Sequence, residues 1–143
     1  MDRHQIVQRY FDAWNAHDAR AIVSTFAAAG TYADPTTPGP LSGEAIGKNA
    51  EQLWQSFPDL RFEVRSHGST GDGLFAAEWT MKGTNRGPFA ALPPSGRTVV
   101  LPGADPAHPA PLAAGGVPLV LTKYPLTPEP PGSSPPAVTP TVL

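Results

Sequence analysis

The sequence predicts an α+β domain in which helices come first along the chain and an antiparallel sheet follows. Apolar side chains recur at helical spacing up to Pro58, and segments with alternating apolar side chains follow it. An Asp72-Gly73 pair, which suits a tight hairpin turn, separates two of these segments. Because the predicted strands are consecutive, we expect helices packed on one face of a bent sheet.

Three helical patterns precede the strands. The apolar face of the first helix, which should end near residues 15–17, has five side chains: Ile6, Val7, Tyr10, Phe11 and Trp14. Asp18 is the expected N-cap of a short second helix that Gly30 ends. Ser42 is the expected N-cap of a third helix that ends at Pro58.

The predicted strands cover residues 60–67, 74–82 and 97–101. On the second strand, every other residue from Phe75 to Met81 should face the helices, because side chains alternate along a strand. Glu78 should therefore face outward, toward solvent or a second copy of the chain.

Composition limits the kind of partner. The chain has 143 residues, a length typical of one domain, and a net charge of -2, which argues against a nucleic-acid surface. It contains no run of about 18 apolar residues that would span a membrane, and we expect a soluble cytoplasmic protein. Cysteine is absent and the four histidines show no metal-like spacing, so no metal is expected.

The chain changes character after Asp105. Eleven of the 19 prolines follow this residue, a density that disfavours helices and central strands. Only residues 117–122 have strand character, and Pro118 would confine them to a sheet edge. We therefore expect a domain at 1–105 and a proline-rich, disordered tail at 106–143, which is either a non-native, frame-shifted ending or a proline-rich linker.

Asp34 is the candidate for chemistry that the residues themselves indicate. It lies in the segment Tyr32-Ala33-Asp34-Pro35, where one carboxylate is placed among apolar neighbours. Removing a proton next to a carbonyl group requires a carboxylate within hydrogen-bond reach, and apolar walls raise the pKa of such a carboxyl group toward neutral pH. The alternative is a turn residue, because Asp before Pro commonly forms turns.

Four segments carry a resemblance to a known family. They are residues 7–18 (VQRYFDAWNAHD), 32–35 (YADP), 56–60 (SFPDL) and 87–97, which contains Gly-Pro-Phe and Leu-Pro-Pro-Ser-Gly-Arg. Together they resemble the SnoaL-like polyketide cyclase family of the NTF2-like superfamily, over residues 1 to about 105. The resemblance implies a cone-shaped α+β barrel that binds apolar ring-bearing molecules without a cofactor and often forms homodimers, here through the outer sheet face.

The resemblance ends where the proline-rich segment begins. Family members continue after the position of Asp105 into further strands, which this sequence replaces with Pro106-Ala107-His108-Pro109. We therefore expect a barrel that is incomplete at its C-terminal side.

A weaker resemblance to ketosteroid isomerases of the same superfamily implies three catalytic roles. Asp34 would be the base, Tyr10 the donor to the enolate oxygen, and Asp105 a second, protonated acid. Each has a structural alternative: Tyr10 lies on the buried face of its helix, and Asp105, directly before Pro106, is more typical of a loop acid.

Five aromatic residues are the predicted substrate-binding wall: Trp14, Trp54, Phe57, Trp79 and Phe89. The three tryptophans are more typical of core and pocket wall than of dedicated stacking against a ligand.

Three functions remain open from the sequence. The first is a cyclase or isomerase that moves a proton next to a carbonyl group of a cyclic or polyketide-like substrate. The second is a binding protein in which Asp34 and Tyr10 only orient a small molecule. The third is an inactive, truncated family member.

Overall fold

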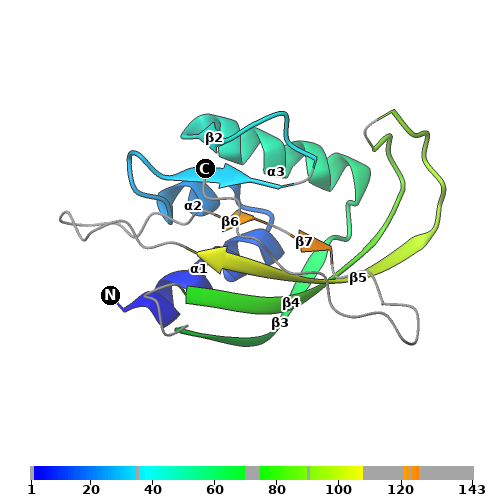
Figure 1. Cartoon of the computed structure of the whole chain (residues 1–143). Coiled ribbons are helices and arrows are strands. Elements are labelled where there is room, and N and C mark those ends of the chain that lie inside the picture. Colours follow the sequence, from blue (N-terminus) through cyan, green and yellow to red (C-terminus); the bar gives the residue numbers. More distant parts are fainter. Residues whose placement is uncertain are drawn as a thin grey trace.

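The computed structural model describes residues 2–34, 36–69, 75–89 and 91–107, with side chains up to 105, and the backbone of 121–122 and 124–125. The elements follow the chain in this order: α1 (Arg3–Asn15), α2 (Ala19–Ser24), β1 (Thr31–Ala33), β2 (Leu41–Ser42), α3 (Glu44–Ser56), β3 (Arg61–Ser69), β4 (Phe75–Thr84), β5 (Thr98–Ala107), β6 (Leu121–Thr122) and β7 (Tyr124–Pro125). Figure 1 shows the helices on one side of the curved sheet that contains β3, β4 and β5.

The strands form two sheets. In the four-stranded sheet the order is β3-β4-β5-β7, and every neighbouring pair is antiparallel. The three-stranded sheet has the order β2-β1-β6, with β6 parallel to β1. The predicted α+β class is therefore confirmed. No strand pairing joins the two sheets within the described residues, so the barrel is open there, as the sequence predicts.

The helix boundaries confirm one predicted cap and correct another. Asp18 caps α2 by accepting a hydrogen bond from the Ala21 amide at 2.9 Å. This helix ends at Ser24, before the predicted stop at Gly30. The prediction that Ser42 caps α3 is wrong, because Ser42 lies in β2 and pairs with Thr31 of β1. The N-cap is Gly43, whose φ of 56° is rarely adopted by other residues.

The core lies between α1 and the inner face of β4. The apolar stripe of α1 is buried, and so are the alternate residues Phe75, Ala77, Trp79 and Met81, while Glu78 is exposed. The alternation predicted for this strand is confirmed. Asn15, at the end of α1, donates to the Phe62 carbonyl at 2.9 Å and accepts from its amide at 2.7 Å. The helix is thereby fixed against edge strand β3.

Strand β5 is longer than the predicted 97–101, because it continues to Ala107. Proline has no backbone N–H group, and residues four apart on a strand direct their N–H groups to the same edge, so Pro102 and Pro106 lack a donor on one edge of β5. The pairing of β5 with β4 is unbroken over all ten residues, which indicates that this edge faces away from β4. The prolines therefore do not end the strand.

Several predictions of order fall largely outside the described residues. Of the predicted strand 117–122, the structure describes only Leu121–Thr122, which lies at a sheet edge as expected from Pro118. The hairpin turn at 71–73 and most of 106–143 are not among the described residues, so the domain boundary and the disordered tail stay predictions. No helix within the described ranges is long and apolar enough to cross a membrane.

Gly103 is the closest packing point between β4 and β5. It pairs with Trp79, and a Cβ atom at position 103 would overlap the indole ring. We expect Gly103→Ala to lower the free energy of unfolding by about 1–3 kcal/mol, because the ring must leave its place in the core. Urea denaturation measures this change.

The matched control for this experiment is Gly68→Ala on β3. A Cβ atom at position 68 meets nothing within 4 Å, so the stability should stay nearly unchanged. Equal loss of stability in both variants would contradict the packing explanation.

Candidate functional site

Four side chains from different elements form a buried polar cluster, which we call the acid–tyrosine cluster: Tyr10, Tyr32, Asp34 and Asp105. Tyr32 lies on β1, and Asp34 follows that strand two residues later, on the same face. The Tyr32 hydroxyl donates to Oδ2 of Asp34 at 2.6 Å. Asp34 itself is half-buried.

The two tyrosines are held in their protonated form. Burial raises the pKa of Tyr10 well above its ordinary value, and the negative charges of Asp105 and, to a smaller extent, Asp34 act in the same direction. Burial also raises the pKa of Tyr32, followed by the effects of Tyr10 and Asp34. Both hydroxyl groups therefore keep their protons at neutral pH, and that of Tyr32 is donated to Asp34.

Asp34 also organises a turn. Its Oδ1 accepts hydrogen bonds from the Thr36 amide at 2.7 Å, the Thr36 hydroxyl at 2.5 Å and the Thr37 amide at 3.1 Å. The turn role that was the alternative to catalysis is thus present in the structure. The same carboxylate group, through its other oxygen, belongs to the acid–tyrosine cluster.

Asp105 is not a loop acid, and this alternative from the sequence is wrong. It lies on β5, pairs with Ala77 and is only 1% exposed. The strand carries it inward because Gly103, two residues earlier on the same face, also lies inside. The sheet therefore places Asp105 within electrostatic reach of Tyr10 and Tyr32.

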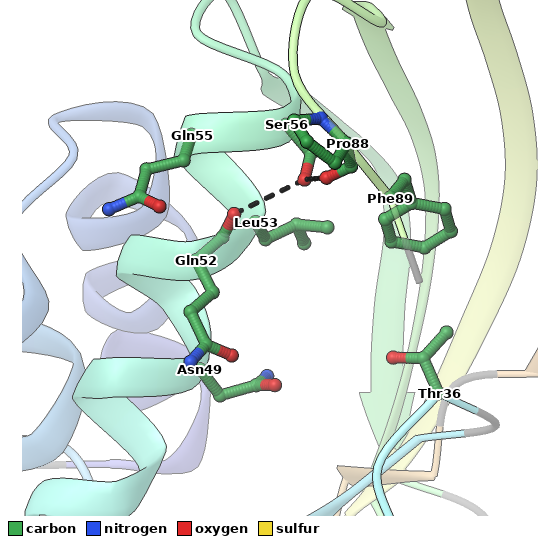
Figure 2. Close-up of a pocket in the computed structure, with 8 residues that line it drawn as sticks. All are labelled: Thr36, Asn49, Gln52, Leu53, Gln55, Ser56, Pro88 and Phe89. Carbon is green, nitrogen blue, oxygen red and sulfur yellow. Dashed lines mark hydrogen bonds between the residues drawn. The ribbon is translucent and has the colours of Figure 1, made fainter. Parts of the chain in front are cut away.

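A groove of about 470 Å³ opens between α3 and Thr36, and we call it the α3 groove. Figure 2 shows its eight lining residues: Thr36, Asn49, Gln52, Leu53, Gln55, Ser56, Pro88 and Phe89. They come from the turn after β1, from α3 and from the segment after β4. The Ser56 hydroxyl donates to the Pro88 carbonyl at 2.5 Å, which fixes that segment to the end of α3.

The five predicted substrate-binding aromatics lie in different environments. Trp14 and Trp79 are buried in the core, and Trp54 stacks on His17 with ring centroids 4.7 Å apart. Phe57 is buried and packs against Phe89 at 5.4 Å between centroids. Of the five, only Phe89 is among the residues that line the α3 groove, and ligand contact by the others stays a prediction.

Sequence reasoning missed Tyr32, Thr36, Asn49 and Gln52. Tyr32 had a usable signal, because residues two apart on a strand share a face and Asp34 was already a candidate. The two amides had none, since polar residues on the outer side of a helix usually face solvent. No group of three or more metal-ligating side chains is found among the described residues.

Comparison with known proteins identifies the family. The SnoaL-like domain matches residues 7–107, which is more than half of the chain. The chain belongs to this family. The match includes α1 from residue 7 onward, the acid–tyrosine cluster and the whole of β5, so the cluster lies within the SnoaL-like domain.

Solved structures share the fold of this SnoaL-like domain. A candidate SnoaL-like polyketide cyclase from Jannaschia sp. CCS1 is 24% identical, with a TM-score of 0.68 over 87% of this chain and 90% of that one. IdmH, a candidate polyketide cyclase from Streptomyces antibioticus, is 19% identical, with a TM-score of 0.69 over 87% and 91% of the two chains.

A third solved structure, from Catenulispora acidiphila, has a ketosteroid isomerase-like fold and contains trimethylamine. It is 18% identical, with a TM-score of 0.68 over 84% of each chain. A comparison with curated proteins finds no match for the chain. The predicted NTF2-like, ketosteroid isomerase-like architecture is therefore confirmed for the SnoaL-like domain.

The raised pKa values of Tyr10 and Tyr32 predict their behaviour in alkali. Each folded-state pKa lies above the unfolded value of about 10.0, so this contribution to stability is complete below pH 10 and is lost as the pH rises further. In a titration followed by tyrosinate absorbance, both residues should ionise only above pH 10, together with unfolding.

The variants Tyr10→Phe and Tyr32→Phe should each remove one of the late-ionising groups from this titration. Reversible ionisation of both tyrosines near pH 10 in the folded protein would contradict the burial argument.

Proposed function

We propose that this SnoaL-like domain transfers a proton at a carbon atom next to a carbonyl group, on a cyclic or polyketide-like substrate. The observation that carries the proposal is the half-buried Asp34 carboxylate beside two tyrosines that stay protonated. A base and neutral donors at one place are what enolate formation requires.

In the proposed reaction, Asp34 accepts the proton as the carbon–hydrogen bond breaks. The electron pair moves to the carbonyl oxygen, and the Tyr10 hydroxyl donates to the resulting enolate oxygen. Asp105, which is 1% exposed on β5, would be the second donor when it carries a proton, the role that the resemblance to ketosteroid isomerases implies. The enolate carbon then takes back the proton from Asp34, or it attacks a second carbonyl carbon of the same molecule. In the second case a ring closes, and the proton held by Asp34 goes to the alkoxide oxygen that forms.

The fold neighbours support the class of substrate. Two of the solved structures are candidate polyketide cyclases, and polyketide chains carry carbonyl groups on alternate carbon atoms, with acidic carbons between them, as this chemistry needs. The proposed reaction requires only side chains for proton transfer, in agreement with the sequence expectation of no cofactor.

A second candidate function is binding without catalysis. The Asp34 carboxylate already accepts four hydrogen bonds, from Tyr32, Thr36 and Thr37, and such bonds favour its charged form and weaken it as a base. In this case Asp34 and Tyr10 orient a ligand and no proton moves.

The deciding experiment measures hydrogen–deuterium exchange next to the carbonyl group of β-tetralone, an aromatic bicyclic ketone, by NMR in deuterated water. The wild-type protein should accelerate the exchange. Asp34→Asn should reduce the acceleration by about 10²–10⁴-fold, because the general base is lost. Asn also forms the turn that Asp34 makes, so the fold should be retained.

Asp12→Asn is the control, since Asp12 lies on the exposed side of α1 and accepts a bond only from Gln8 among the described side chains. Binding of β-tetralone without accelerated exchange would favour the binding protein. Neither binding nor exchange would favour the inactive family member.

The proposal includes a homodimer through the outer face of β3, β4 and β5. Val100, which pairs with the outward-facing Lys82, is 61% exposed on this face. Val100→Asp should shift the protein toward monomer in sedimentation velocity, while an unchanged distribution would place the contact elsewhere. The cytoplasmic location expected from the sequence stays a prediction.

A further inference from the structure

The wall of the α3 groove that is formed by the helix carries amide side chains. Asn49 and Gln52 are one helical turn apart, so their β-carbons lie about 5–6 Å from each other. In Figure 2 the Asn49 side chain points into the space that Thr36 and Phe89 border on the opposite side, and the Gln52 side chain runs along α3 toward Asn49. Neither amide makes a hydrogen bond with another residue in the part of the chain that the structure describes.

The opposite wall is positioned by the fold. The Ser56 hydroxyl binds the Pro88 carbonyl, and the amides of Arg86 and Gly87 donate to the Ser56 carbonyl at 2.9 and 3.2 Å. Phe89 then packs against Phe57, with its ring at the edge of the groove. The groove therefore offers an aromatic surface facing two amide groups.

The chemistry of the lining selects for uncharged ligand groups. The lining residues include neither an acidic nor a basic side chain. Amides both donate and accept hydrogen bonds, so they match hydroxyl and carbonyl oxygens, whereas a carboxylate or phosphate would find no cation here.

Thr36 connects the groove to the acid–tyrosine cluster. Its hydroxyl donates to Asp34 at 2.5 Å, and the residue also lines the groove. One hydrogen bond therefore links the lining of the groove to the Asp34 carboxylate.

We infer that the α3 groove binds the neutral, oxygen-bearing end of the substrate, with its ring against Phe89 and its hydroxyl or carbonyl groups on Asn49 and Gln52. The inference rests on the proposed function, because it assumes that the reacting carbonyl lies at Asp34. It narrows the substrate class to compounds with polar, uncharged groups remote from the reacting carbonyl.

The test compares three probes by calorimetric titration: β-tetralone, its derivative with two hydroxyl groups on the aromatic ring, and its derivative with a carboxylate on that ring. The wild-type protein should bind the dihydroxy compound roughly tenfold more tightly than the parent ketone, as expected for one or two added hydrogen bonds. The carboxylate derivative should gain nothing.

The double variant Asn49→Leu with Gln52→Leu should bring the ratio of the two affinities close to one. Gln52 is exposed, so Gln52→Leu alone is the variant to use if the double variant fails to fold, and it should lower the ratio in part. Glu51→Leu is the control, because Glu51 lies between the two amides in sequence but lines a separate groove with α2, and the ratio should be kept.

An unchanged ratio in the double variant, a preference for the carboxylate, or no binding of any probe would overturn the inference. These results concern binding affinities. The proposed function is tested separately, by the hydrogen–deuterium exchange of β-tetralone, so the two can fail independently. Preference for the dihydroxy compound without exchange would leave the groove as a binding site and reject the catalytic role of Asp34.

Discussion

The contact between Trp79 and Gly103 is the constraint on which the site depends. The absence of a side chain at position 103 lets the indole ring lie across β5, so β4 and β5 stay closely paired below the helices. The next inward residue of β5 is Asp105, opposite the small Ala77. A large residue at either small position would disturb the packing that holds this carboxyl group within electrostatic reach of Tyr10.

The acid–tyrosine cluster has members in the helices and in both sheets of the domain. Tyr10 comes from α1, Tyr32 from the short sheet, Asp34 from the residue that follows β1, and Asp105 from the long sheet. Three of these four residues are almost fully buried, so the polar groups lie within the same core whose apolar packing stabilises the fold. Asp34 can form the turn and bind Tyr32 at once, because the two roles use different oxygens. Oδ1 accepts from the turn, and Oδ2 accepts from the Tyr32 hydroxyl.

Much of the fold was predictable from the sequence because its signals are local. Helical spacing identified α1, and strict alternation identified the buried face of β4. The length of β5 was not predictable. A strand can contain proline where the missing N–H group would not have faced a neighbouring strand, and this depends on how the strands pair and not on the local sequence. Ser42 has the side chain of a typical N-cap, but in the structure it lies in β2 and pairs with Thr31 of β1 instead.

The candidate site was predictable in part for the same reason. Asp34 was identified by its apolar neighbours, whereas the burial of Asp105 depends on the register between β4 and β5. The amides of the α3 groove depend on the segment around Pro88, which Ser56 holds across the helix end. A contact between residues 32 positions apart gives no periodic pattern in the sequence, so it could not be predicted.

The Thr36 hydroxyl has a single proton, which at present is donated to Asp34. If a ligand oxygen in the groove takes that proton, the carboxylate loses one donor and becomes a stronger base. Occupancy of the groove and proton affinity at Asp34 are then two linked equilibria, and each must change the other by the same factor. A compound that does not reach Thr36 would leave the base in its weaker state.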